Sequence, residues 1–110
     1  MTVLCALADL ADPGAKGVTL EGADRFREIV VVRRLGHVFA YENICPHIGT
    51  PLNFLPDRFL TRDGRHLLCS THGALFEIAS GLCTHGPCRG QSLKTVPFAV
   101  RDGQVVLANG

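Results

Sequence analysis

The chain has 110 residues, of which 46% are hydrophobic, and this length allows one ordinary core rather than two. Eleven Lys and Arg residues against ten Asp and Glu residues leave a net charge of +1, so the basic excess typical of nucleic-acid-binding proteins is missing. The longest fully aliphatic run, residues 29–32, is far shorter than the roughly twenty residues of a membrane-spanning helix. We therefore expect one domain over residues 1–110, with a protein or small-molecule partner and no nucleic acid or membrane.

The segments between Gly and Pro residues are rich in Val, Ile, Leu, Phe and Thr, which is typical of short strands joined by turns. In chain order, the predicted strands are residues 2–8, 18–21, 28–35, 37–42, 59–61, 66–68, 75–78, 93–100 and 104–107. Asp63-Gly64 and Asp102-Gly103 suit tight hairpin turns because both residue types tolerate a positive φ. No stretch has a convincing helical period. The sequence therefore predicts an all-β fold with antiparallel sheets.

Two polar stretches break this strand pattern. Residues 43–56 contain three prolines, and residues 80–92 are rich in glycine. Loops on a rigid β scaffold are where small proteins often place a functional site. Both stretches contain or adjoin cysteine and histidine pairs, so we expect the site there.

The five cysteines are odd in number and unevenly spaced, which argues against a fully paired disulfide framework. The first residues also lack the cationic head of a secretory signal. In a reducing cytosol, cysteines of this kind are more often metal ligands or buried thiols. We expect a cytoplasmic protein in which some cysteines bind metal.

Two short motifs combine a cysteine with a histidine. Cys45-Pro46-His47 comes first, and Cys69-Ser70-Thr71-His72 follows after 21 intervening residues. Two thiolates and two imidazoles suit a pair of iron ions bridged by sulfide, with Cys45 and Cys69 on one iron and His47 and His72 on the other. Because neutral imidazole brings no negative charge, such a cluster accepts an electron more readily than one held by four cysteines.

These motifs resemble the two cluster-binding loops of Rieske proteins, in residues 45–52 (CPHIGTPL) and 69–76 (CSTHGALF). Residues 86–93 (GPCRGQSL) are similar to the proline-containing loop that shields the cluster in that family. The resemblance implies a small antiparallel β-sandwich with the cluster loops at one tip and one [2Fe–2S] cluster. It also implies a ferredoxin, not itself an enzyme, that passes single electrons between a reductase and a terminal oxidoreductase, often an aromatic-ring oxygenase.

The chain departs from respiratory Rieske proteins at four positions. Thr50 and Thr71 stand where those proteins have a further disulfide-bonded cysteine pair, so that bridge cannot form here. Ala74 and Phe76 replace the serine and tyrosine whose hydroxyls donate to cluster sulfurs. We therefore expect a midpoint potential towards the lower end of the Rieske range of roughly −150 to +300 mV. The long spacer predicts an extra hairpin, residues 59–61 against 66–68.

Other interpretations of these residues stay open. The same four side chains could hold a structural zinc ion, although zinc sites usually group their Cys pair and His pair separately. A small electron-relay subunit of a larger oxidoreductase complex is a second alternative. Cys83-Thr84-His85 is another Cys-x-His, with Cys88 nearby; we expect Cys83 and Cys88 to pack beside the cluster, with ligation or a mutual disulfide as the alternatives.

Overall fold

The computed structural model describes residues 2–21, 26–46, 49–53, 57–70 and 73–108. Nine strands are found there, with one short 3₁₀ helix, η1 (Leu7–Asp9). The strands are β1 (Thr2–Ala6), β2 (Gly14–Glu21), β3 (Phe26–Arg34), β4 (His37–Glu42), β5 (His66–Leu68), β6 (Leu75–Glu77), β7 (Cys83–His85), β8 (Phe98–Arg101) and β9 (Gln104–Leu107). All their pairings are antiparallel. The predicted all-β antiparallel fold is confirmed.

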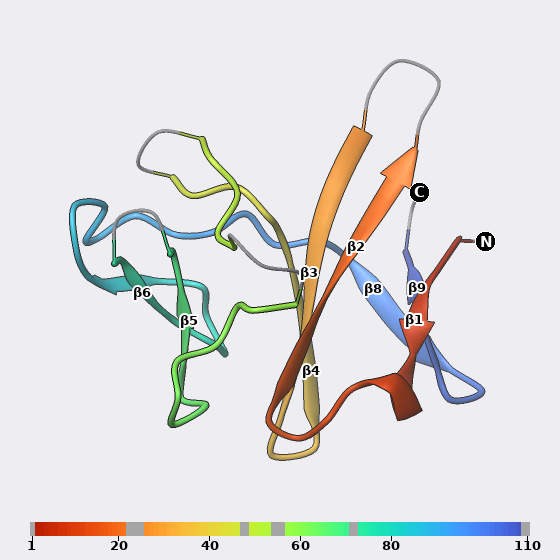
Figure 1. The fold of residues 1–110 in the computed structure, drawn as a ribbon. Helices are drawn as coiled ribbons and strands as arrows, with labels where there is room; N and C mark the ends of the chain where they lie inside the picture. Colours follow the sequence, from red (N-terminus) through yellow and green to blue (C-terminus); the bar gives the residue numbers. More distant parts are fainter. Residues whose placement is uncertain (1, 22–25, 47–48, 54–56, 71–72, 109–110) are drawn as a thin grey trace.

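The strands form three three-stranded sheets, in the orders β1-β9-β8, β2-β3-β4 and β5-β6-β7. The sheet of β2, β3 and β4 lies between the other two, with β5 and β6 on its left in Figure 1 and β1, β8 and β9 on its right. The sheet of β5, β6 and β7, whose strands are short, carries the second predicted cluster loop between β5 and β6.

Strand β3 is buried on both faces. Ile29, Val30, Val31 and Val32 are all 0% exposed. Successive side chains of a strand point to opposite faces, so Val30 and Val32 pack into the core shared with β5 and β6. Ile29 and Val31 pack into a second core with residues of β1 and β9. A central strand between two cores explains the continuous aliphatic run in the sequence.

Tyr41 connects the middle sheet to the smaller one. Its hydroxyl donates a hydrogen bond of 2.6 Å to the backbone oxygen of Ile78, and burial raises the pKa of Tyr41 to about 12. The ring packs closely on Gly81, where an added Cβ would lie 2.8 Å from Tyr41 Cε1. The segment that follows β6 is thus held against β4.

Three of the predicted strands, residues 37–42, 66–68 and 104–107, have the observed bounds. The strand predicted over residues 93–100 is wrong in its first part, because β8 begins only at Phe98. Residues 59–61 form no strand, yet Leu60 pairs with Leu67 as an isolated bridge, so the extra hairpin exists in reduced form. β7 was not predicted at all.

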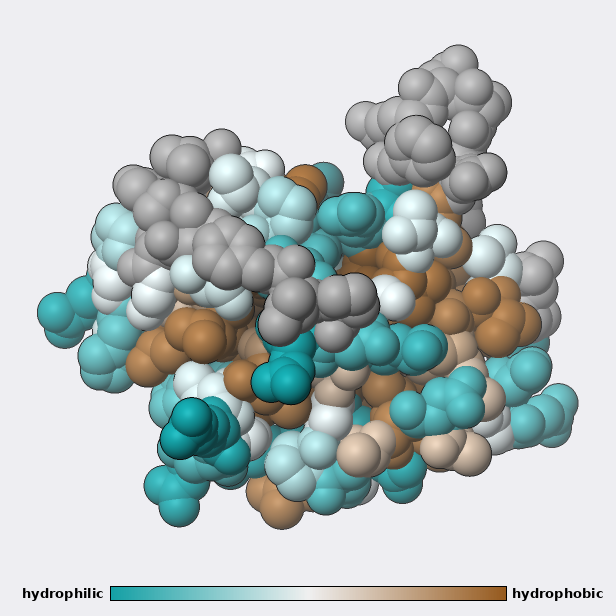
Figure 2. Space-filling model, viewed as in Figure 1, coloured by the Kyte–Doolittle hydropathy of each residue, from teal (hydrophilic) through white to brown (hydrophobic). Residues whose placement is uncertain are grey.

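Within the described ranges, no helix is long and apolar enough to cross a membrane. Figure 2 shows hydrophobic and hydrophilic residues interspersed over the visible face, without one dominant apolar surface among the coloured residues. Five large hydrophobic side chains are exposed in the described residues, namely Val3, Leu35, Ile44, Leu82 and Val100. Of these, only Ile44 lies next to a predicted cluster ligand in the sequence.

Candidate metal centre

The first predicted cluster loop follows β4 and is closed at its base by Asn43. The Asn43 side chain accepts a hydrogen bond of 2.8 Å from the Leu52 amide and donates one of 3.0 Å to Asn53 Oδ1. The backbone amide of Asn43 donates to the backbone oxygen of Glu28, at 2.8 Å. The buried side chain of Asn43 therefore links the two ends of the loop, and its backbone attaches the loop to β3.

The two cluster loops have the same backbone hydrogen bonds. The Cys45 amide donates to Thr50 O at 2.7 Å, and the Gly49 amide donates to Cys45 O at 2.8 Å. In the second loop, the Cys69 amide donates to Ala74 O at 2.9 Å, and the Gly73 amide donates to Cys69 O at 2.8 Å. Each loop therefore turns back on its cysteine over the same number of residues.

The glycine in each loop is required by the backbone rather than by lack of space. Gly49 has φ +79° and Gly73 has φ +71°, which is the left-handed region that other residues enter only with strain. An added Cβ at either position would meet no atom within 4 Å. Both glycines therefore permit a backbone path that other residues would adopt only with strain.

The two loops lie side by side and bring their cysteines into one core. The Ser70 amide donates a hydrogen bond of 2.8 Å to the backbone oxygen of Leu52, which joins the second loop to the first. Cys45 and Cys69 are each 0% exposed and belong to the same buried cluster. Two thiols that are distant in sequence thus belong to one buried core.

His47 and His72, the other two predicted ligands, lie outside the described residues. Their positions in sequence are not equivalent, since His47 is the second residue after its cysteine and His72 the third. The two histidines therefore differ in their sequence spacing from the cysteine, although the described backbone hydrogen bonds of the two loops match.

Cys83 is the first residue of β7, and Cys88 lies in the third loop, which follows that strand. Both are 1% exposed and belong to the same core as Cys45 and Cys69. The Cys88 thiol donates to Cys83 Sγ at 3.2 Å, and no disulfide joins them. The pKa of Cys88 is raised to about 12, mainly because the thiol is buried and secondly because it donates a hydrogen bond to Cys83.

Gly86 brings the third loop against the second. Its φ is +102°, and an added Cβ would lie 2.8 Å from the backbone Cα of Ala74. Gly90, in the same loop, has φ +91° but no atom within 4 Å of an added Cβ. Both glycines have a positive φ, but only Gly86 lies against the second cluster loop. Comparing substitutions at the two positions therefore distinguishes the effect of backbone strain from the effect of this contact.

We expect Gly86→Ala to lower the apparent stability by about 1–3 kcal/mol more than Gly90→Ala, because only the former forces the two loops apart. Urea titrations of the two variants, run alongside the unmodified protein, measure this difference. Equal losses would mean that the Gly86 contact does not hold the loops together.

The donor set and its surroundings fit an iron–sulfur cluster. Two buried thiols and two histidines supply the sulfur and nitrogen donors of a mixed Cys/His [2Fe–2S] site. The Thr50 hydroxyl, next to Gly49, is buried and has no hydrogen-bond partner among the residues that the structure describes. A polar atom left in this way is one that a bound group could satisfy.

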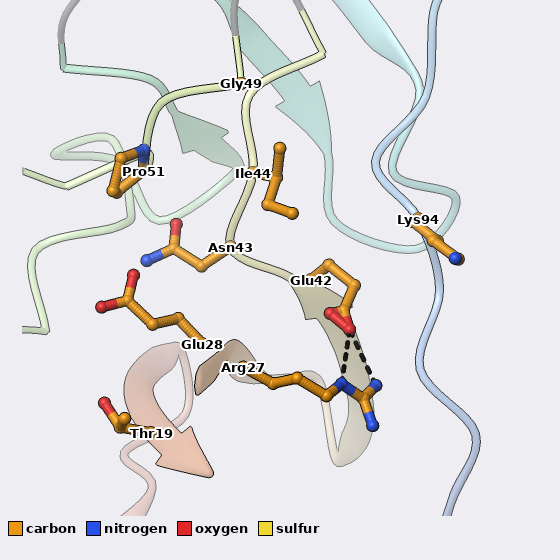
Figure 3. A pocket seen from close by; sticks show the side chains of 9 residues that line it. All are labelled: Thr19, Arg27, Glu28, Glu42, Asn43, Ile44, Gly49, Pro51 and Lys94. Carbon is orange, nitrogen blue, oxygen red and sulfur yellow. Dashed lines mark hydrogen bonds and ion pairs between the residues drawn. The ribbon is translucent and has the colours of Figure 1, made fainter. Parts of the chain in front are cut away.

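A separate hollow of about 630 Å³ lies at the base of the first loop (Figure 3). Its wall includes Ile44, Gly49 and Pro51, and an ion pair joins Arg27 Nη2 to Glu42 Oε1 at 2.7 Å. None of the described residues that line it is a Cys or a His.

A model of the Rieske [2Fe-2S] domain family matches residues 1–100. The chain therefore belongs to the Rieske [2Fe–2S] domain family, and its cofactor is one [2Fe–2S] cluster. A comparison with curated proteins finds no match.

Solved structures agree with this assignment. The chain is 29% identical to a Sphingomonas yanoikuyae B1 ferredoxin, with a TM-score of 0.73 and coverage of 98% of this chain and 97% of the other. A chain in a complex of reduced oxygenase and oxidized ferredoxin of carbazole 1,9a-dioxygenase is 26% identical, with a TM-score of 0.76 and coverage of 96% and 99%. The terminal oxygenase of carbazole 1,9a-dioxygenase from Nocardioides aromaticivorans IC177 is 22% identical, with a TM-score of 0.77, and the match covers 99% of this chain and 30% of that one.

Asn43 and Gly86 shape the site and were not singled out from the sequence. Asn43 is the first residue after a strand and precedes the first cysteine motif, which is a weak signal for a loop-closing side chain. Gly86 precedes a proline and reads as an ordinary turn residue. Their roles depend on partners distant in sequence, so no local pattern could have identified them.

Proposed function

We propose that this chain is a Rieske-type ferredoxin that carries single electrons from a reductase to a terminal oxygenase, with an aromatic-ring oxygenase as the natural acceptor. Cys45 and Cys69 hold one iron of the cluster, and His47 and His72 hold the other. The observation that carries this proposal is the pair of equivalent loops that bring two buried cysteines together, each followed by a histidine. The cluster, when bound, supplies a site that gains and loses one electron.

The protein's own residues set the conditions for that exchange. Burial of both cysteines keeps water from the thiolate side of the site, so charge on the ligands is weakly screened. The hydrogen bonds of Asn43 and Ser70 hold the two loops in fixed positions, which keeps structural change between redox states small. A rigid site of this kind suits rapid electron exchange.

Similarity to ferredoxins over nearly their whole length supports a one-domain carrier over residues 1–110. One of these ferredoxins is described in complex with an oxygenase, which supports an oxygenase as acceptor. We further propose a cytoplasmic location, because five unevenly spaced cysteines do not suit the fully paired disulfide framework of a secreted protein.

A second candidate is a relay subunit or domain held within a larger oxidoreductase. The match to 30% of a terminal oxygenase chain favours it, because the same fold serves there as one part of a longer protein. The two candidates differ in how long the chain stays bound to its acceptor. The zinc module considered above is not supported by the family match.

Electron transfer can be tested with purified components. The chain, reduced by one equivalent of electrons, is mixed anaerobically with an oxidised Rieske-type oxygenase while absorption is followed. We expect reoxidation with one electron delivered per chain and with separation of the two proteins afterwards. Absence of transfer to any such acceptor would contradict the carrier proposal, and a complex that persists on gel filtration would favour the relay.

A further inference from the structure

The first cluster loop contains a buried hydroxyl group that no neighbour pairs with. Thr50 Oγ1 is shielded from solvent, and it forms no hydrogen bond with any group in the part of the chain that the structure describes. A hydroxyl can donate one hydrogen bond and accept others, so burying it unpaired costs free energy. Such groups are uncommon in folded proteins, and a bound ion or ligand is one of the partners that explain them.

The backbone places Thr50 beside a predicted cluster ligand. Its carbonyl oxygen accepts a hydrogen bond of 2.7 Å from the Cys45 amide, so Thr50 closes the turn that begins at this cysteine. Ala74 has the same position in the second loop, where its oxygen accepts a bond of 2.9 Å from the Cys69 amide. Ala74 is 0% exposed and belongs to the core that contains both cysteines. Of these two equivalent positions, only the first carries a hydroxyl group.

The side chain of Thr50 does not face the hollow at the base of the loop. Gly49 and Pro51, its two neighbours, line that hollow, whereas Thr50 is not one of the lining residues (Figure 3). Water in the hollow therefore does not reach the hydroxyl, in agreement with its burial. A group bound by the cluster loops is the partner that fits a hydroxyl in this position.

We propose that, in the cluster-loaded protein, the Thr50 hydroxyl donates a hydrogen bond to a sulfur atom of the cluster and thereby raises its midpoint potential. The inference rests on the proposed function, because it requires a cluster at these loops. The sulfide and thiolate sulfurs of a [2Fe–2S] cluster accept hydrogen bonds, and such bonds tune its potential. Because Thr50 Oγ1 is buried, solvent does not compete for the bond.

The direction of the effect follows from charge. An added electron increases the negative charge on the sulfur atoms, so a hydroxyl donor stabilises the reduced cluster more than the oxidised one. We expect loss of the donor to lower the equilibrium constant for reduction by about threefold to tenfold, which is the size of one ordinary hydrogen bond. A tenfold change corresponds to ~59 mV for a one-electron couple.

Thr50→Val and Thr50→Ser separate the hydroxyl from the shape of the side chain. Thr50→Val keeps the branched shape without the hydroxyl, whereas Thr50→Ser keeps the hydroxyl without the methyl group. Thr84→Val is the matched control, because the Thr84 hydroxyl already has partners, Leu75 O at 3.5 Å and His85 Nδ1 at 2.9 Å. In anaerobic redox titrations, we expect the potential to fall in Thr50→Val and to stay near the wild-type value in the other two variants.

Pulsed EPR of the reduced protein after exchange into D₂O gives a second measurement. We expect Thr50→Val to lack one deuteron coupled to the cluster that the wild type and Thr50→Ser retain. Thr50→Ala, which also lacks the donor, replaces Thr50→Val if that variant assembles no cluster.

A lower potential together with the lost deuteron supports the inference. An unchanged potential without the hydroxyl, or an equal fall in Thr50→Ser or Thr84→Val, overturns it. A wild-type protein that assembles no cluster contradicts the proposed function instead, so the two failures are distinguishable.

Discussion

Cys69→Ala and Cys45→Ala are each expected to reduce the iron content of the purified protein to less than about a tenth of the wild-type value. Replacing residues that only support metal ligands typically costs 10–100-fold in affinity, and loss of a ligand thiolate costs at least as much. Both cysteines are 0% exposed, and each lies in one of the two loops that the Ser70–Leu52 bond joins. Iron and acid-labile sulfide per chain, together with visible absorption, measure the loss.

Cys5→Ala is the control for this experiment. Cys5 is also buried, but it lies in the core formed by β1, β9 and one face of the middle sheet. Its removal tests the effect of a lost buried thiol without touching the cluster loops. Full iron content in Cys45→Ala or Cys69→Ala would mean that the cluster is held by other residues, with Cys83 and Cys88 the first to examine.

The double variant His47→Cys with His72→Cys is expected to keep a [2Fe–2S] cluster at a much lower potential. Two neutral imidazoles are replaced by two thiolates, so the formal charge of the oxidised cluster falls from about zero to about minus two. Clusters with four cysteines of the plant type lie near −400 mV, whereas the Rieske range begins at about −150 mV. We therefore expect the midpoint potential to fall by roughly 250 mV or more.

His37→Cys provides the comparison for that variant. His37 is exposed at the start of β4, at the turn between β3 and β4, which lies at the end of the middle sheet opposite the cluster loops (Figure 1). It adds a thiol without adding a ligand, so its potential should match the wild type. A double variant with an unchanged potential would show that His47 and His72 do not bind the cluster.

Much of the fold could be predicted from local patterns. β4 and β9 are short hydrophobic runs next to tight turns, and their bounds were predicted correctly. β7 was missed because Cys83-Thr84-His85 carries no strand pattern and lies in a glycine-rich stretch. It exists because β6 supplies a partner edge, with Phe76 opposite Cys83 and a register shift beside it.

The strand predicted over residues 93–100 shows the opposite error. Its hydrophobic residues suggested one continuous strand, but Pro97 has no amide hydrogen to donate to a neighbouring strand. Before it, Thr95 meets Tyr41 only as an isolated bridge, and regular pairing starts at Phe98. The chain thus crosses from β4 to β9 over residues that read as a single element.

The cluster loops were predictable because their chemistry is written in adjacent residues. Each motif carries its cysteine, histidine and glycine within five residues, so pairing the motifs needed no knowledge of the fold. The contacts around them were not predictable in this way. The packing of Gly86 on Ala74 and the bond from the Asn43 amide to Glu28 O join residues from separate segments.

The most direct test of the central claim is to count iron, sulfide and zinc in anaerobically purified protein and to record its EPR spectrum before and after dithionite. We predict about two iron and two sulfide ions per chain, no signal when oxidised, and, after reduction, the low average g value typical of mixed Cys/His ligation. A colourless, EPR-silent protein with stoichiometric zinc would contradict the assignment of a redox cluster to Cys45, His47, Cys69 and His72.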